Sequence, residues 1–163
     1  MTRRHWMLAL AAGVPGRGVA DRRDALVPLD EASFRQMVAN HRGKVLLVDF
    51  WATWCGPCRE EMPPLVALSS ARKQRGFELI TVSCDEPEQE GAAADFLAQQ
   101  HAPTPRYIRR THSDDAFINS IDPKWSGALP ALFLFDRSGR QLASLIGEVQ
   151  IKQIEAAVEK ALS

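Results

Sequence analysis

The distribution of apolar and polar positions predicts strands and helices that alternate along one domain. Two almost wholly apolar runs, Val45–Trp51 and Phe77–Ser83, are typical of central strands that are covered on both faces. Residues 55–75 lie between these runs and are predicted to form a helix, so the two strands should be parallel. Pro63 and Pro64 fall inside that helix and are expected to kink it.

The flanking segments complete this pattern. Asp30 is placed to cap a helix over Glu31–Asn40, whose apolar positions follow helical spacing. Residues 132–135 and 142–146 flank a short Gly-containing loop, which predicts an antiparallel hairpin, and an amphipathic pattern over 151–162 predicts a final helix. Parallel strands with a hairpin added at the end predict an α/β fold, with a mixed central sheet between helix layers.

The stretch between the second strand and the hairpin has weaker patterns. We expect a crossover helix over residues 86–100, with three side chains facing inward, namely Ala92, Phe96 and Leu97. A short edge strand over 106–108, a short helix over 113–121 and a turn-rich segment over 122–127 should follow.

Length and composition favour a single globular domain. The chain has 163 residues, of which 45% are hydrophobic and 25% are charged, and this is enough for one core. Lys and Arg number 20, as do Asp and Glu, so no basic excess indicates a nucleic-acid partner. The chain has 3 cysteines, a count that excludes a scaffold stapled by several disulfides.

The N-terminus has the pattern of an export signal. Residues 1–20 combine a basic start at Arg3-Arg4, a short apolar run and a small-residue sequence at Gly18-Val19-Ala20. The start also loosely resembles a twin-arginine signal. We therefore expect 1–20 to direct export to the periplasm or envelope, with possible membrane association, 21–28 to be a linker and 29–163 to be the folded domain. The alternative is a basic tail on a cytosolic protein.

Trp54-Cys55-Gly56-Pro57-Cys58 is the motif with the clearest chemistry. It follows the first apolar strand at the point where a helix should begin. Two thiols at this spacing can close a disulfide that reopens readily, and a helix N-terminus favours the thiolate that starts the exchange. The motif therefore predicts dithiol/disulfide exchange.

Residues 48–58, together with Leu129-Pro130 before the hairpin and Gly147 after it, resemble the thioredoxin fold. The export signal, Glu61-Met62-Pro63 and the added segment 86–125 further resemble the TlpA/ResA-like thiol:disulfide reductases of bacterial envelopes. The likeness covers residues 28–163. It implies a thioredoxin fold with an N-terminal extension and a central insertion.

This resemblance implies a role for each residue of the motif. Cys55, as the more exposed thiol and open to water, is expected to attack a substrate disulfide, and Cys58 is expected to resolve the mixed disulfide. Gly56 and Pro57 match the dipeptide of reducing thioredoxins, which favours donation of electrons to the substrate. We expect Trp54, Gly56 and Pro57 to contact the substrate.

Two acidic residues are further catalytic candidates. Asp49 interrupts an apolar strand, and its counterpart in the thioredoxin pattern helps Cys58 lose its proton. The alternative for Asp49 is a structurally satisfied or partly exposed carboxylate. Glu61 matches a glutamate that TlpA/ResA-like proteins place near the active site, although a solvated residue on the helix face is an equal alternative.

Leu129 and Pro130 are expected to complete the substrate-binding surface. The resemblance implies a cis bond before Pro130, which would bring the backbone of Leu129 beside the sulfurs to pair with an extended substrate. Ala131 departs from the family pattern, where threonine is common. Cys84 ends the second strand and is expected to be a buried structural thiol, with a redox role as the alternative.

Other functions are weaker alternatives. No metal or cofactor is expected, since the four histidines show no paired spacing and a second CxxC is absent from the sequence. A copper-handling protein and a thiol peroxidase that uses Cys55 remain open, as does a disulfide oxidase or isomerase.

The expected partners are therefore protein disulfides. We expect a monomer that reduces disulfides in envelope proteins, with apocytochrome c as one candidate through the family resemblance. A reductase outside the cytoplasm also needs a membrane electron donor, which the family implies.

Overall fold

A mixed sheet of six strands is the centre of the computed structural model, which describes residues 25–163. The strand order is β1-β4-β3-β2-β5-β6. The first four strands in this order are parallel to one another, whereas β2 with β5 and β5 with β6 are antiparallel. The bounds of the strands are as follows: β1 Val27–Leu29, β2 Val45–Trp51, β3 Phe77–Ser83, β4 Tyr107–Arg109, β5 Ala131–Phe135 and β6 Gln141–Ile146.

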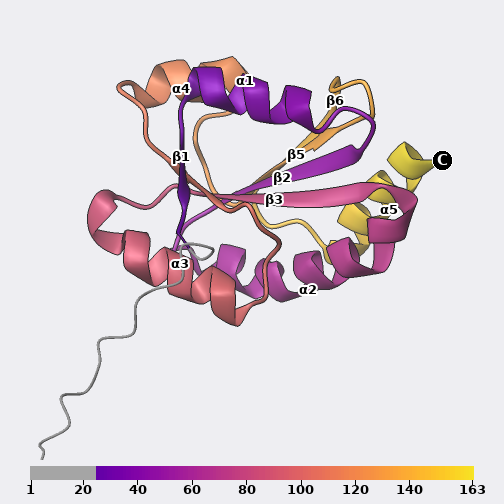
Figure 1. Cartoon of the computed structure of the whole chain (residues 1–163), viewed down its shortest axis with the longest axis horizontal. Helices are drawn as coiled ribbons and strands as arrows, with labels where there is room; N and C mark the ends of the chain where they lie inside the picture. Colours follow the sequence, from indigo (N-terminus) through magenta and orange to yellow (C-terminus); the bar gives the residue numbers. More distant parts are fainter. Residues whose placement is uncertain (1–24) are drawn as a thin grey trace, which may run out of the picture.

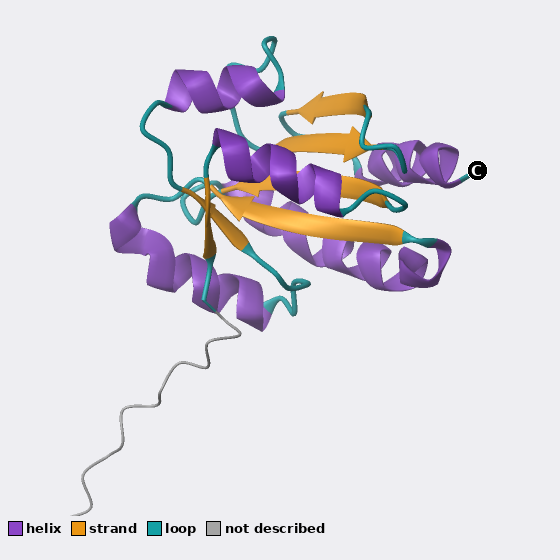
Figure 2. Ribbon diagram, turned by 45° about the horizontal axis from the view of Figure 1, so that its top comes forward, coloured by secondary structure: helices purple, strands orange, loops and turns teal. Residues whose placement is uncertain are grey.

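Helices cover both faces of this sheet, which confirms the predicted α/β architecture (Figures 1 and 2). Helices α1 and α4 lie on one face, and α2, α3 and α5 lie on the other (Figure 1). Their bounds are α1 Glu31–Asn40, α2 Gly56–Arg72, α3 Glu90–Gln99, α4 Asp114–Ile121 and α5 Ile151–Leu162, with short 3-10 turns at Lys73–Arg75 and Pro87–Gln89.

Strand β2 lies between β3 and β5, and all seven of its residues are buried. Successive side chains of a strand point to opposite faces. Leu46, Val48 and Phe50 accordingly join the core under α1 and α4, while Val45 and Leu47 join the core that packs against α2 and α5. The alternation assigns Asp49 to the second face, the one that α2 covers.

A smaller apolar cluster lies where β2 leads into α2. It contains Trp51, both cysteines of the motif and Met62, together with Ala93 and Leu97 from α3. The Trp51 ring lies 5.0 Å from the ring of Phe96, centroid to centroid. Helix α3 therefore packs directly beside the cysteine pair.

The structure corrects several details of the predicted elements. Val27 and Pro28, expected in the linker, form part of β1, which pairs with β4. Strand β4 is consequently an inner strand of the sheet and β1 is the edge. The export signal predicted for residues 1–20 lies outside the described residues.

Two predicted helices also differ. In α3 the predicted Phe96 and Leu97 face inward, but Ala93 joins them rather than Ala92, which is exposed, because Ala93 lies one turn before Leu97 on the same face. Helix α2 begins at Gly56 and continues through Pro63 and Pro64 as one helix to Arg72. The prolines therefore do not end the helix, and the kink expected at them stays a prediction.

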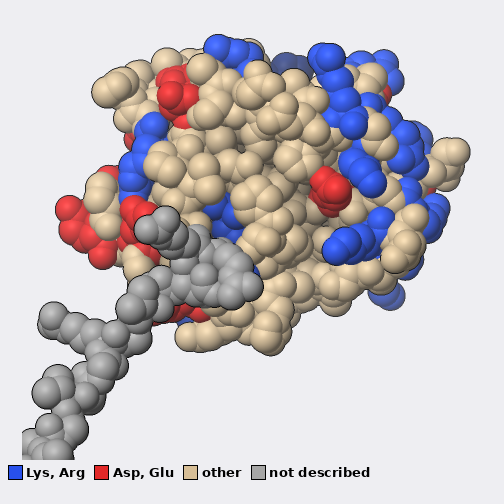
Figure 3. Space-filling model, viewed as in Figure 1, with Lys and Arg blue, Asp and Glu red and all other residues tan. Residues whose placement is uncertain are grey.

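Lys and Arg side chains gather at the end of the molecule where α2 ends and β3 begins (Figure 3). At this end Arg72 and Arg75 both form ion pairs with Glu159 of α5. Arg137 donates hydrogen bonds to the backbone oxygens of Gly43 and Arg75, at 3.1 Å each. This charged end is opposite the carboxyl ends of β2 and β3, where the cysteine motif lies.

Among residues 25–163, none of the helices has both the length and the hydropathy needed to cross a membrane.

Candidate active site

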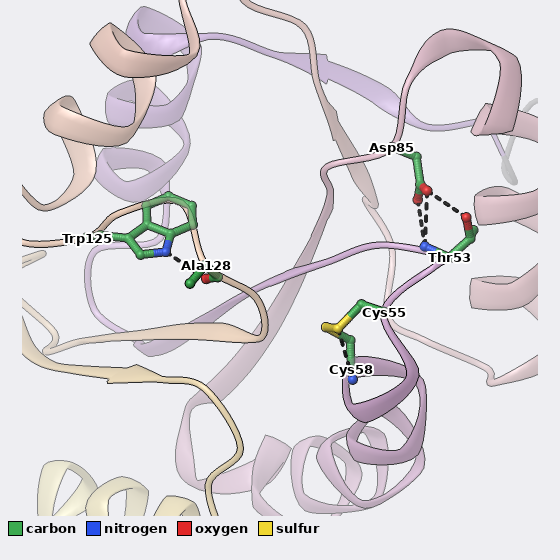
Figure 4. The surroundings of a disulfide bond; sticks show 6 residues. All are labelled: Thr53, Cys55, Cys58, Asp85, Trp125 and Ala128. Atoms are coloured by element: carbon green, nitrogen blue, oxygen red, sulfur yellow. Dashed lines mark hydrogen bonds between the residues drawn. A yellow bond between two sulfur atoms is a disulfide. The ribbon is translucent and has the colours of Figure 1, made fainter.

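Cys55 and Cys58 form a disulfide at the first turn of α2 (Figure 4). Cys55 is the N-cap residue of this helix, and its Sγ accepts a hydrogen bond from the backbone N–H of Cys58 at 3.3 Å. Backbone N–H groups of a first helical turn have no partner within the helix and favour negative charge nearby. The pair therefore stands where a Cys55 thiolate gains electrostatic stabilisation, as the sequence predicted.

The exposure of the motif differs from what we expected. Cys55 is more exposed than Cys58, but the values are only 6% and 1%, so the prediction of a sulfur open to water is wrong for the disulfide form. Trp54, by contrast, is 70% exposed. Both sulfurs pack within an apolar cluster, and the indole of Trp54 presents a large apolar surface beside them.

Gly56 and Pro57 occupy the exposed start of α2. A proline suits this position because it has no N–H, and an N–H here would lack a helical partner. The N–H of Cys58 is thus left to interact with the Cys55 sulfur.

The bond between Leu129 and Pro130 is cis, which confirms the prediction from the resemblance. The backbone N–H of Gly147 donates to the Pro130 oxygen at 2.8 Å, and the indole N–H of Trp125 donates to the Ala128 oxygen at 2.9 Å (Figure 4). Leu129 packs against the cluster that contains both cysteines. The segment before β5 is therefore held beside the disulfide. A second cis bond, between Thr104 and Pro105, had no signal in the sequence.

Asp49 is buried on β2, and both of its carboxylate oxygens lack a hydrogen-bond partner among the described residues. Removal of the carboxylate from water raises its pKa well above the usual value, and the nearby charge of Glu61 raises the pKa further. Burial that favours the uncharged carboxyl is consistent with a residue that exchanges a proton rather than one that forms an ion pair. The structure excludes the alternative of a partly exposed Asp49.

Glu61 lies on α2, one turn after Cys58, and is half-buried. Burial raises the pKa of its carboxyl to about 7. Together with Pro57, Pro64 and Glu148, it lines a cavity of about 230 Å³. The structure therefore disfavours the alternative of a fully solvated residue, and the charge of Glu61 is near enough to raise the pKa of Asp49.

Asp85 and Thr53 form a link that we did not predict. The buried Asp85 carboxylate accepts hydrogen bonds from the Thr53 backbone N–H at 3.0 and 3.1 Å and from the Thr53 hydroxyl at 2.6 Å (Figure 4). The Ser83 hydroxyl donates to the same carboxylate at 2.7 Å. These bonds tie the loop before Cys55 to the end of β3. The sequence indicates this link in one way only: Thr53 and Asp85 each follow one of two predicted parallel strands, and the carboxyl ends of parallel strands lie at the same edge of a sheet.

Cys84 is a free thiol at the end of β3, partly exposed rather than buried as predicted. Burial of the sulfur raises its pKa to about 12. The thiolate is therefore strongly disfavoured. This result agrees with the expected structural role and argues against Cys84 as a nucleophile.

Within residues 25–163, no three His, Cys, Asp or Glu side chains converge on a position where they could hold a metal ion.

Comparison with known families agrees with this geometry. The model of the Redoxin family matches residues 26–162, which is nearly all of the described chain. The chain belongs to the Redoxin family. Its thioredoxin-like fold and its cysteine pair are both consistent with this membership.

Two curated relatives of this Redoxin chain carry names that refer to disulfide chemistry. The thiol-disulfide oxidoreductase ResA of Bacillus cereus is 34% identical over 119 residues, which cover 73% of this chain and 64% of that protein. The thiol:disulfide interchange protein HelX of Rhodobacter capsulatus is 33% identical over 141 residues, 85% of this chain and 69% of the relative. The alignment with ResA thus spans less than two thirds of that protein's length.

Comparison with solved structures also finds a thiol-disulfide oxidoreductase. The thioredoxin domain of a thiol-disulfide oxidoreductase from Bacteroides vulgatus superposes with a TM-score of 0.62 at 26% identity, covering 77% of this chain and 84% of that domain. Taken with the ResA and HelX relatives, this match relates the chain to the TlpA/ResA-like branch that the motifs indicated.

Proposed function

We propose that this chain is a thiol:disulfide oxidoreductase that reduces disulfide bonds in other proteins. The observation that carries the proposal is the Cys55–Cys58 disulfide at the N-terminus of α2, beside the cis bond before Pro130. The names of the ResA and HelX relatives support the same activity.

The reaction starts from the reduced pair. The Cys55 thiolate attacks one sulfur of a substrate disulfide, a new S–S bond forms, and the other substrate sulfur leaves as a thiolate. Cys58 then loses its proton and attacks the Cys55 sulfur, which releases the second substrate thiolate. Two electrons pass to the substrate, and the protein is left with the Cys55–Cys58 disulfide that the structure contains.

Asp49 and Glu61 supply a route for the proton of Cys58. Asp49 lies on the strand face that α2 covers, and Glu61 follows Cys58 by one turn of α2. A carboxyl group whose pKa is near 7, as for Glu61, can both accept and release a proton at neutral pH. We assign Asp49 the transfer of the proton and Glu61 its exchange with solvent.

The substrates and the location are also part of the proposal. The sequence of residues 1–20 favours export, which would bring the protein to envelope substrates, and apocytochrome c is one candidate. Reduction in that compartment requires a membrane electron donor to regenerate the dithiol. Gly56 and Pro57 favour this direction of electron flow.

Trapping with Cys58→Ser tests the activity. This variant can form the mixed disulfide but cannot resolve it, so covalent adducts with cellular proteins should accumulate and dissolve on reduction. Cys55→Ser is the matched control and should trap nothing. Absence of adducts with Cys58→Ser contradicts the assignment of the two sulfurs.

Measurement of the reduction potential of the Cys55–Cys58 pair tests the direction of electron flow. A value near that of thioredoxin, about −270 mV, supports a reductase, whereas a value near about −120 mV indicates an oxidant.

A further inference from the structure

A cavity of about 160 Å³ lies beside the exposed face of the cysteine motif. Its walls come from the motif, the segment after β3, strand β4, helix α4 with the loop that follows it, and the residue before the cis bond. The lining residues are Trp54, Cys84, Glu86, Arg109, Phe117, Ile118, Trp125, Gly127 and Leu129. Trp54 precedes the Cys55 nucleophile and Leu129 precedes the cis bond, so the cavity is continuous with the site of disulfide exchange.

The walls are mainly apolar and aromatic. Phe117 and Trp125 are buried and form the interior, where each contacts a neighbouring aromatic ring, while Ile118 is half-buried. An apolar cavity of about 150 Å³ is large enough to bind benzene. The volume and the walls therefore fit one six-membered ring.

The mouth of the cavity carries charges that are already paired. Arg109 lies 3.1 Å from Asp114 and 3.7 Å from Glu86, measured between guanidinium nitrogen and carboxylate oxygen. A ligand group that enters thus meets a neutralised guanidinium rather than an unpaired charge. Guanidinium groups also stack favourably on aromatic rings.

Cys84 contributes a neutral wall to this cavity. Because its thiolate is strongly disfavoured, the sulfur acts here as a small apolar group. Trp54 completes the opening with an indole that is mostly exposed. An exposed tryptophan beside an aromatic-lined cavity is an arrangement suited to contact with a partner's ring.

We propose that this cavity binds an aromatic side chain of the substrate polypeptide, close in sequence to the cysteine that Cys55 attacks. The inference rests on the proposed disulfide reductase activity and adds a preference among its substrates. It assigns α4 and the loop that follows it to substrate selection, and it distinguishes this cavity from the separate one that Glu61 lines.

Short peptides closed by an internal disulfide provide the test. In one series Phe replaces Ala in turn at each position near the attacked cysteine, and the pre-reduced protein is mixed with each peptide. At one position or more, the Phe peptide should be reduced about tenfold faster than its Ala counterpart, because burial of the ring in the cavity stabilises the complex. Oxidised glutathione, a small disulfide without an aromatic ring, reports the basal reductase activity of the wild-type protein.

Variants that fill the cavity should abolish this preference. Cys84→Leu occupies its interior, and Ile118→Phe fills it from α4, so either should bring the Phe-to-Ala rate ratio close to one. Ala39→Leu is the matched control, because it adds a similar volume to a cavity of about 280 Å³ between α1, α4 and the β5–β6 hairpin. The Ala39→Leu variant should keep the wild-type Phe-to-Ala rate ratio. If Cys84→Leu does not fold, Ile118→Phe decides the result.

The outcomes separate the two proposals. Equal rates for the Phe and Ala peptides, with oxidised glutathione reduced normally, overturn the aromatic site and leave the reductase activity in place. A preference that persists in a folded filled variant also overturns it. Failure of the wild-type protein to reduce any disulfide overturns the proposed function, and the inference with it.

Discussion

The Asp85 carboxylate holds the Thr53 residue through both its backbone N–H and its hydroxyl, with the shortest bond at 2.6 Å. Thr53 precedes Cys55 by two residues, whereas Asp85 follows β3, so one buried side chain joins the ends of two neighbouring strands. Ser83 shares the same carboxylate. This link fixes the loop from which the nucleophile enters α2.

Asp85→Ala should destabilise the domain by about 2 kcal/mol or more, because hydrogen bonds to charged groups each contribute about 1.5–3 kcal/mol and buried donors would be left without partners. Urea denaturation measures the change. Thr53→Ala removes only the hydroxyl donor and should cost about 1 kcal/mol. Equal stability of Asp85→Ala and the wild-type protein contradicts a role in holding the loop.

The two buried aspartates show how far the sequence could predict the site. Asp49 could be identified because a single acid in an apolar strand requires an explanation. Asp85 follows a strand, where acidic residues are common in turns and caps, and its partner is 32 residues away. The burial of Cys55 also depends on residues distant in sequence, from α3 and the segment before β5, so the motif alone could not reveal it.

The secondary-structure elements also differ in how well the sequence predicts them. Helix α1 and strands β2 and β3 have the predicted bounds because their patterns are local and long enough to read. Strands β1 and β4 have 3 residues each, too few to show a period. Their pairing, for example Val27 with Tyr107, is set by tertiary contacts that span half of the chain.

Glu61 should make stability depend on pH between about 4.5 and about 7. Its pKa is raised in the folded chain, so the folded state binds the proton more tightly than the unfolded state does. The contribution of Glu61 to the free energy of unfolding is therefore fully present below about pH 4.5, and it is lost as pH rises to about 7, because only the unfolded chain readily ionises this group in that range. Asp49 acts in the same direction.

Urea denaturation at pH 5 and pH 8 measures this dependence. The wild-type protein should be less stable at pH 8, and Glu61→Gln should show a smaller difference between the two conditions. Carboxyl groups with lowered pKa values, such as Asp136 at about 2, remain ionised at both pH values and do not contribute. If Glu61→Gln keeps the full wild-type difference in stability between pH 5 and pH 8, the raised pKa of Glu61 is contradicted.

Asp49→Asn should slow the second step of exchange, in which Cys58 attacks Cys55, by at least about tenfold, because proton transfer by a positioned group typically contributes a factor of about 100 or more. The fold should be retained or slightly stabilised, since the carboxylate has no hydrogen-bond partner among residues 25–163. Stopped-flow measurement of mixed-disulfide decay across pH tests the role. A packing role predicts an unchanged pH profile, whereas proton transfer predicts that the profile loses one ionisation.

The N-terminus of α2 should lower the pKa of Cys55 in the reduced protein below the ordinary cysteine value of about 8.5. The Cys58 N–H that contacts the Cys55 sulfur in the disulfide form would stabilise its thiolate, together with the helix dipole. Alkylation by iodoacetamide across a pH series, with mass spectrometry to identify the modified residue, measures this pKa in Cys58→Ser. Cys84, whose pKa is raised to about 12, is the internal comparison and should react only after denaturation. A Cys55 that reacts no faster than an ordinary thiol at pH 7 removes the electrostatic basis of the proposed mechanism, since the thiolate must be present to attack.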